Sequence, residues 1–323
     1  MVPDAALVER FSDELRALVG SDARVGVAVS GGPDSLALLL LAAAAMPGRV
    51  ESATVDHGLR PEAHEEAAMV AEVCERLGLP HVTLTARWSE APKTAIQERA
   101  RQQRYLLLGY WAEERGLDAL ATAHHADDQA ETLLMRLARG SGVRGLAGMR
   151  PRSITPGSHI KLIRPLLRWR GSELEAVCAK AGLKPVADPS NEDDRFERVR
   201  VRQALANIEW LDPAAVARSA ANLGDADAAL DWASRFEWGQ SVQERRDSIH
   251  YRPDNAPVEI VRRIVARAIR KLAVEGDAEL RGSELNRLIE RLSAGGSATI
   301  RGVQCHGGLE WSFNVAPARR SRG

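Results

Sequence analysis

The hexapeptide at residues 30–35, Ser-Gly-Gly-Pro-Asp-Ser, has the residue types best suited to holding a phosphate. Glycines let backbone N–H groups approach an anion, serine hydroxyls add donors, and a following helix N-terminus adds positive potential. The hexapeptide lacks the lysine of the GxxxxGK[ST] phosphate loop and does not have the GxGxxG spacing of a dinucleotide loop. We therefore expect a phosphate-binding turn of another class.

Asp34 gives this loop a feature that a bare phosphate site would not need. Its carboxylate would repel a phosphate unless a Mg²⁺ ion lay between the two groups. The alternative is a tight turn in which Asp34 only caps the next helix. We favour a magnesium-linked pyrophosphate with Asp34 as the metal ligand, bound by all six loop residues: Ser30, Gly31, Gly32, Pro33, Asp34 and Ser35.

Three residues near the expected strand ends add to this site. Asp56 and His57 follow the β-branched run 50–55, and nucleotide sites form beyond the carboxyl ends of parallel strands. His57 would contact the nucleotide or cap the next turn. Ala28 leads into the loop, and its small side chain leaves room for a base.

A second group of candidate residues starts the helix expected at 126–139. Its members are three or four residues apart and should share one helix face: His124, Asp127, Asp128 and Glu131. Carboxylates there would hold ammonium groups or Mg²⁺; the alternative is a solvated acidic first turn favoured by the helix dipole. Arg104, with Arg101 three residues earlier, is suited to bidentate contact with a phosphate or carboxylate. For Arg101, pairing with Glu98 on the helix surface stays an alternative.

The elements that must position these residues alternate along the first part of the chain. Short apolar strands alternate with helices, which predicts βαβ units and a parallel sheet with helices on both faces. The expected strands are 25–29, 50–55, 81–85, 117–123 and 160–164, and the expected helices are 36–45, 61–77, 94–115, 126–139 and 171–181.

A break at 183–202 separates this α/β domain, residues 1–200, from a smaller and mainly helical domain, residues 201–323. Helices are expected at 213–238, 256–273 and 283–293. A C-terminal hairpin would pair 298–304 with 308–313, placing His306 in its turn. The tryptophans of this part are expected in its core: Trp210, Trp232, Trp238 and Trp311.

Composition restricts the function classes. The chain has 323 residues, 45% hydrophobic and 27% charged, which excludes a disordered or collagen-like protein. The longest apolar run, 36–46, is too short to cross a bilayer, so we expect no membrane association. Three scattered cysteines indicate a reduced cytoplasm. The sequence leaves the oligomeric state open, with a homodimer as one alternative.

Taken together, the motifs resemble those of a known family. The loop at 30–35 resembles the pyrophosphate loop of the N-type ATP pyrophosphatases, which adenylate an oxygen that a nucleophile then displaces. Further segments are similar to the tRNA(Ile)-lysidine synthetases, in order over about the first 200 residues: 55–61, 100–105, 124–132, 139–146 and 164–167.

The resemblance implies a reaction in two steps. The C2 oxygen of the wobble cytidine in CAU-anticodon isoleucine tRNA attacks the α-phosphate of ATP, and L-lysine then displaces AMP. It implies that the loop binds ATP, together with Ala28, Asp56 and His57. It also implies catalytic or lysine-binding roles for Arg104, His124, Asp127, Asp128 and Glu131, with the division of the acids between lysine and Mg²⁺ left open.

The expected tRNA or phosphate contacts are Arg198, Arg200 and Arg202. With Asp188, Ser190 and Asn191 they resemble the family's segment between domains, which has Asn where this chain has Val199. That departure leaves open whether Arg198 or Arg202 takes the active-site role. The alternatives are a tRNA-thiolating relative, an amidotransferase relative and a non-catalytic nucleotide-binding module. The dispersed cysteines and the absence of a glutaminase pattern disfavour the first two.

Overall fold

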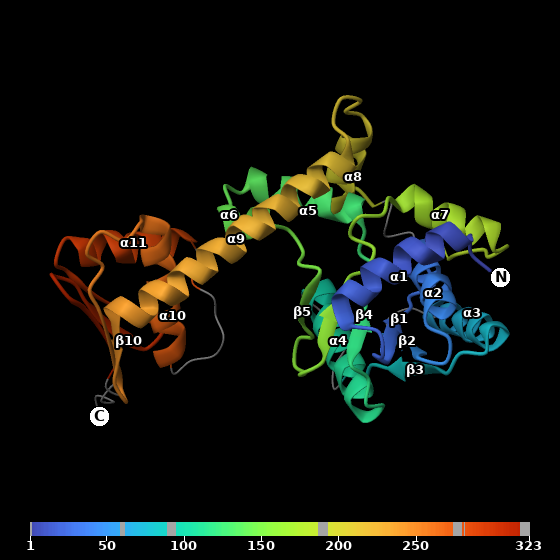
Figure 1. Cartoon of the computed structure of the whole chain (residues 1–323), viewed down its shortest axis with the longest axis horizontal. Coiled ribbons are helices and arrows are strands. Elements are labelled where there is room, and N and C mark those ends of the chain that lie inside the picture. The colour runs from blue at the N-terminus through green and yellow to red at the C-terminus, as the bar shows by residue number, and fades with distance from the viewer. Residues whose placement is uncertain are drawn as a thin grey trace. The chain divides into compact units, whose positions relative to one another are not determined.

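The computed structural model describes residues 2–58, 62–88, 95–186, 193–273, 280 and 282–316. By its contacts the chain divides into two compact units, Met1–Asn222 and Leu223–Gly323 (Figure 1). The expected boundary at residue 200 falls inside helix α8, Glu197–Ala206, which packs on α5, Ala126–Ala138, within the first unit.

The first unit contains a six-stranded sheet in the order β3-β2-β1-β4-β6-β5. All neighbouring strands are parallel except the edge strand β5, which runs antiparallel to β6 and was not expected from the sequence. The strands are β1 Val25–Ala28, β2 Val50–Asp56, β3 His81–Thr85, β4 Ala119–Ala121, β5 Arg152–Ile154 and β6 Lys161–Ile163.

Helices cover both faces of this sheet, as the alternating pattern predicts. One buried cluster joins α1, α2, α3 and α7 to the sheet, and a second joins α4 to the other face through Leu108 and Trp111. The helices of the unit are α1 Ala5–Val19, α2 Pro33–Ala45, α3 Glu62–Leu77, α4 Ile96–Glu114, α5 Ala126–Ala138, α6 Val143–Leu146, α7 Gly171–Lys180 and α8 Glu197–Ala206. The fold-class prediction is therefore confirmed, although α1 and α6 were not foreseen.

The strand order determines where a site can form. The chain leaves β1 toward β2 on one side, whereas β4 lies on its other side. This reversal is a topological switch point, where the loops beyond the strands diverge and open a crevice for ligands. The segments that follow β1 and β4 are the expected phosphate loop and the start of α5. Both motifs thus lie at this switch point.

The second unit contains an antiparallel sheet in the order β7-β8-β11-β10-β9. Its strands are β7 Val242–Glu244, β8 Ser248–Tyr251, β9 Ser297–Ile300, β10 Val303–His306 and β11 Trp311–Val315. Helices α10, Val258–Leu272, and α11, Gly282–Ser293, accompany it, and the long α9, Pro213–Ser241, runs from one unit into the other.

Two expectations for this part were wrong. The first expected hairpin strand is two strands, because Arg301 and Gly302 have φ of 50° and 74° and reverse the chain between β9 and β10. His306 therefore lies in β10 and not in a turn. The expectation of a single hairpin also missed β7 and β8.

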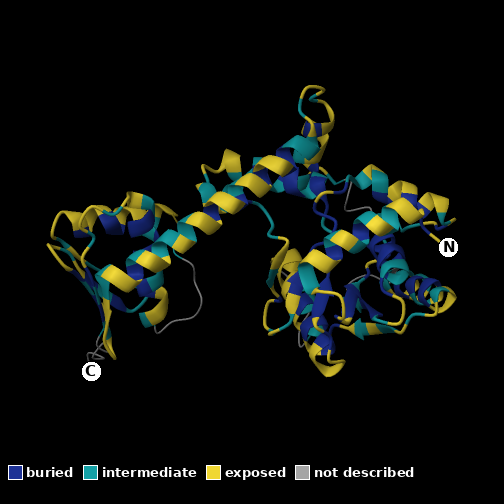
Figure 2. Ribbon diagram, in the orientation of Figure 1, coloured by how far each residue is buried: buried dark blue, intermediate teal, exposed yellow. Residues whose placement is uncertain are grey.

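The tryptophan prediction was half right. Trp238 and Trp311 are 7% and 3% exposed and belong to the core of the second unit. Trp210 and Trp232 are 84% and 66% exposed, and Trp232 stacks on Phe236 one turn further along α9. Figure 2 shows exposed residues at intervals along this helix. Among the described helices none is both long and apolar enough to cross a bilayer.

Candidate functional site

The hexapeptide forms a compact turn between β1 and α2. Ser35 Oγ accepts from the backbone N–H of Ser30 at 3.1 Å and donates to the carbonyl of Gly32 at 3.0 Å. Gly31 has φ +87°, and a Cβ there would lie 3.3–3.4 Å from Met69 and Val186, so glycine is needed. A Cβ at Gly32 would meet nothing closer than 3.8 Å, so open space lies beside the loop where an anion would bind.

The neighbouring strand ends carry the other expected nucleotide residues. Ala28 ends β1, is half-buried and pairs with Ala53 of β2. Asp56 ends β2, and its Oδ1 accepts from Gly58 N–H at 2.8 Å, while the carbonyl of His57 accepts from Trp88 Nε1 at 2.8 Å. These contacts shape the turn after β2.

The start of α5 differs from the expectation in one respect. The helix begins at Ala126 with His125 as its N-cap, so His124 precedes the helix and does not share a face with the acids. His125 Nδ1 lies 3.2 Å from the Asp127 N–H, and Asp128 Oδ2 accepts from the His125 N–H at 3.0 Å. The bond from the His125 N–H fixes the direction of the Asp128 side chain.

His125 also joins the loop to the acids of α5. Its Nε2 lies 3.5 Å from Asp34 Oδ2 and 3.6 Å from Asp128 Oδ2, and its Nδ1 lies 3.4 Å from Asp127 Oδ2. Burial alone would lower the pKa of His125, but the surrounding carboxylates outweigh it and raise the pKa to about 10. The sequence analysis overlooked this residue, although its N-cap position next to two acids was a usable signal.

Asp127 is engaged by structural partners. Its Oδ1 accepts from Arg170 Nε at 2.9 Å and its Oδ2 from the Gly171 N–H at 2.7 Å, which anchors the start of α7. Burial would raise its pKa, but the His125, Gly171 and Arg170 contacts lower it well below its usual range. A ligand-binding role for Asp127 would have to compete with these contacts.

Asp128 and Glu131 face α8. Arg198 donates from Nη2 to Asp128 Oδ1 at 2.9 Å and from Nε to Glu131 Oε2 at 2.6 Å. Arg202 Nε donates to Glu131 Oε1 at 2.6 Å. Both arginines thus contact the buried Glu131, and only Arg198 also contacts Asp128. We call Asp127, Asp128 and Glu131 the acidic cluster.

Arg200 lies apart from this cluster. Its Nη1 donates to the backbone carbonyls of Asp194 and Arg195, and the side chain is exposed. Asp188, Ser190 and Asn191 lie outside the described residues.

A group of cations faces His124. His124 Nδ1 lies 3.0 Å from Thr122 Oγ1, and its pKa is lowered to about 3, first by burial and then by Arg164, Arg101, Arg104 and Arg198. We call Arg101, Arg104 and Arg164 the arginine cluster. In the part of the chain that the structure describes, none of these three forms an ion pair with a carboxylate.

The residues present fit ATP and Mg²⁺. Among the described residues no group of three or more His, Cys, Asp or Glu side chains is arranged to hold a metal ion by itself. Mg²⁺ commonly keeps several waters and is held by one or two carboxylates plus phosphate oxygens. The Asp34 carboxylate, 38% exposed in the first turn of α2, can supply such a ligand.

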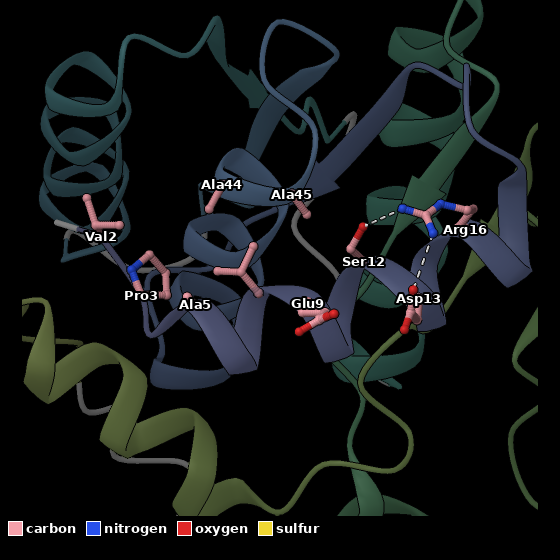
Figure 3. A pocket seen from close by; sticks show the side chains of 10 residues that line it. Val2, Pro3, Ala5, Glu9, Ser12, Asp13, Arg16, Ala44 and Ala45 are labelled. Carbon is pink, nitrogen blue, oxygen red and sulfur yellow. Dashed lines mark hydrogen bonds and ion pairs between the residues drawn. The ribbon is translucent and has the colours of Figure 1, made fainter.

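A hollow elsewhere contains none of the expected residues. It lies along α1 and includes Glu9 and Ala45, with Arg16 contacting Ser12 and Asp13 (Figure 3). No buried polar group faces it, so the switch point stays the candidate site.

Comparisons with known proteins identify the family of the chain. The profile of the PP-loop domain matches residues 7–209. A protein of Novosphingobium aromaticivorans named tRNA(Ile)-lysidine synthase is 48% identical over 315 residues, covering 97% of this chain and 94% of that protein. A protein of the same name from Zymomonas mobilis is 41% identical, covering 96% and 94%.

The fold is also similar to that of the U34-tRNA thiolase NcsA from Methanococcus maripaludis, with a TM-score of 0.55, 20% identity, and coverage of 67% of this chain and 78% of that one. At that identity the similarity concerns the fold alone. The identity over nearly the full length is far more specific: this chain belongs to the PP-loop domain family and, within it, to the tRNA(Ile)-lysidine synthases.

Proposed function

We propose that this chain joins L-lysine to C2 of the wobble cytidine of CAU-anticodon isoleucine tRNA, consuming ATP with Mg²⁺. The observation that carries the proposal is that two groups lie at one switch point: an open phosphate loop, and acids of α5 that Arg198 and Arg202 of α8 contact. A protein that only binds a nucleotide would need the phosphate loop but not the acids of α5. We further propose that the protein works in the cytoplasm.

In the first step the cytidine C2 oxygen forms a bond to the α-phosphorus, the bond to the β-phosphate oxygen breaks, and pyrophosphate leaves. The remaining loop N–H groups and the Ser30 hydroxyl bind the leaving pyrophosphate, while the Ser35 hydroxyl holds the turn through the Ser30 N–H and the Gly32 carbonyl. Mg²⁺ held by Asp34 offsets its charge when bound. The cations facing His124 stabilise the negative charge that accumulates around the transferring phosphorus.

In the second step a lysine amine forms the new C–N bond at C2, the C–O bond breaks, and AMP leaves. The amine loses a proton as it bonds, and the phosphate oxygen of the departing AMP takes it up. Asp128 is the acid best suited to hold an ammonium group of lysine. Its side chain is 15% exposed and has one guanidinium partner, Arg198, whereas Asp127 is tied to Arg170 and the start of α7, and Glu131, 1% exposed, is tied to two arginines. Glu131 then positions Arg198 and Arg202.

Thiolation, the activity named for the structural neighbour, is not favoured here. Cys74, Cys178 and Cys305 are all buried, and the buried surroundings raise the pKa of each thiol. Buried thiols with raised pKa values are poor nucleophiles and poor cluster ligands.

The test is incorporation of labelled lysine into unmodified CAU isoleucine tRNA with ATP and Mg²⁺, with AMP and pyrophosphate measured together. Lysine incorporation matched by one AMP and one pyrophosphate is the expected result. AMP release without lysine transfer would contradict the proposed nucleophile, and no ATP turnover would indicate a binding module. A gel-filtration mass of twice the chain would support a homodimer.

A further inference from the structure

Two polar atoms in and next to the arginine cluster are buried and make no hydrogen bond of good geometry with the described residues, although the Tyr105 hydroxyl lies close enough to Arg104 and Arg164 to raise their pKa values. They are the hydroxyl of Tyr105 and the Nε of Arg164, in side chains that are 3% and 8% exposed. A buried donor without a partner typically costs about 1–3 kcal/mol, so native proteins rarely leave one without a ligand, water or function to occupy it.

The surroundings of Tyr105 are strongly positive. The guanidinium carbons of Arg101 and Arg104 lie 5.0 and 5.4 Å from the centre of its ring. Burial lowers the pKa of Arg104 and of Arg164, and the nearby charge of Arg101 lowers both further. Among the described residues, no carboxylate pairs with any of these three guanidinium groups, which is unfavourable unless an anion binds there.

Arg164 is held in place by contacts at its other end. Its Nη1 donates to the Arg150 carbonyl at 2.7 Å and to Ser153 Oγ at 3.1 Å, which fixes the guanidinium while Nε stays available. Anchoring of this kind positions a side chain before a ligand binds and so reduces the entropy that binding costs.

Arg164 also lies at the correct edge of the sheet. It directly follows β6, which runs parallel to β4, with Ile163 opposite Ala121. The Ile163 carbonyl accepts from the Thr122 N–H at 3.0 Å, two residues before His124. The arginine cluster therefore shares the carboxyl end of the sheet with the start of α5.

We propose that the Tyr105 hydroxyl and Arg164 Nε, together with Arg101 and Arg104, bind a phosphate group of the nucleotide substrate. The inference rests on the proposed function, and it assigns sites to two residues for which the motifs gave no role. A phosphate is favoured over the lysine carboxylate because three unpaired cations exceed the single charge of a carboxylate, whereas ATP carries about four negative charges.

The sharpest test is Tyr105→Phe, measured as the Kd for ATP with Mg²⁺ by equilibrium dialysis without tRNA or lysine. Loss of a hydrogen bond to a charged group should raise Kd about 10-fold or more. The melting temperature should stay unchanged or rise, because the variant removes a buried hydroxyl that has no protein partner. Tyr110→Phe is the matched control, since Tyr110 lies on the same helix and is 63% exposed.

An unchanged Kd for ATP in Tyr105→Phe would overturn the proposal, as would a rise in KM for lysine alone, which would assign the donors to the carboxylate. A lower melting temperature with equal loss toward every substrate would indicate a purely structural role and also overturn it. Because ATP binding is measured by itself, failure of lysine transfer in the wild-type protein would be seen separately.

A second variant tests Arg164 without depending on the tyrosine. Arg164→Lys keeps a positive charge but removes Nε, so the Kd for ATP should rise at least 10-fold. Ser153→Ala removes only one anchor of the guanidinium and should have a several-fold smaller effect. Equal ATP affinity in Arg164→Lys and wild type would contradict the assignment of Nε.

Discussion

The acidic cluster and the arginine cluster flank the same switch point, but their charges are balanced in different ways. Each acid of the acidic cluster already accepts from a protein cation: Asp127 from Arg170, Asp128 from Arg198, and Glu131 from Arg198 and Arg202. The arginine cluster has no carboxylate partner among the described residues, and it includes the buried Arg164 Nε and contacts the buried Tyr105 hydroxyl, neither of which makes a hydrogen bond of good geometry there. The difference indicates that the acidic cluster is largely preformed by the fold, whereas the arginine cluster is completed by a substrate.

The largest expected effect concerns lysine selectivity within the acidic cluster. Asp128→Asn should raise KM for lysine about 10- to 100-fold, because an ammonium group loses its charged acceptor, and should leave KM for ATP nearly unchanged. Asp127→Asn is the control: Asp127 contacts Arg170 and Gly171 and supports α7, so its replacement should raise KM for lysine less than Asp128→Asn does. If Asp128→Asn raised KM for lysine and KM for ATP equally, Asp128 would be a Mg²⁺ ligand and not a lysine-binding residue.

The next prediction concerns stability. Glu131→Gln should lower the free energy of unfolding by about 2–3 kcal/mol, because two arginines lose the buried carboxylate that they share. This loss in stability is smaller than for a fully buried ion pair, because both arginines are partly exposed. Glu197→Gln breaks an exposed pair with Arg139 and should cost less than about 1 kcal/mol in the same denaturant titration. Similar losses in the two variants would contradict the preformed character of the acidic cluster.

The charge of His125 makes the stability of the acidic cluster depend on pH. Its folded-state pKa of about 10 lies above the unfolded value of 6.5, so its stabilising contribution is complete below about pH 6.5 and is lost as pH rises through 10. His125→Gln should therefore be less stable than wild type at pH 6 by about 1–2 kcal/mol, and the gap should close near pH 10.5. Denaturant unfolding across this range measures it, and a gap that stays constant with pH would refute a charged His125.

The smallest expected effect lies on the surface of α8. Arg200→Glu should weaken tRNA binding several-fold and reduce the slope of log affinity against log salt, because an exposed cation is replaced by an anion. ATP affinity should not change, since Arg200 contacts only backbone carbonyls outside the acidic cluster. Filter binding at several salt concentrations is the measurement, and unchanged tRNA affinity would place the RNA surface elsewhere.

The sequence predicted those parts of the fold and site that depend on local pattern. Alternating apolar runs gave the strands and most helices of the first unit, and glycines next to a helix start gave the loop at 30–35. The short edge strand β5 and the turn at Arg301 were not predicted, because three or four residues are too few to show a periodic pattern.

The pairing of charges could not be predicted from one sequence. Asp127, Asp128 and Glu131 look equivalent along the chain, and only the packing of α7 and α8 separates their partners. Likewise, nothing local marks Arg164 or the Tyr105 hydroxyl as unpartnered, since that depends on the contact between β6 and β4 and on the burial of α4.

The most direct test is to measure the affinity for ATP and the KM for lysine in the two variants Asp128→Asn and Tyr105→Phe. The account predicts opposite selectivity: Asp128→Asn impairs lysine use with ATP binding intact, and Tyr105→Phe weakens ATP binding with KM for lysine intact. If both variants impaired the same substrate, the division of the site into a lysine-binding acidic cluster and a phosphate-binding arginine cluster would be wrong.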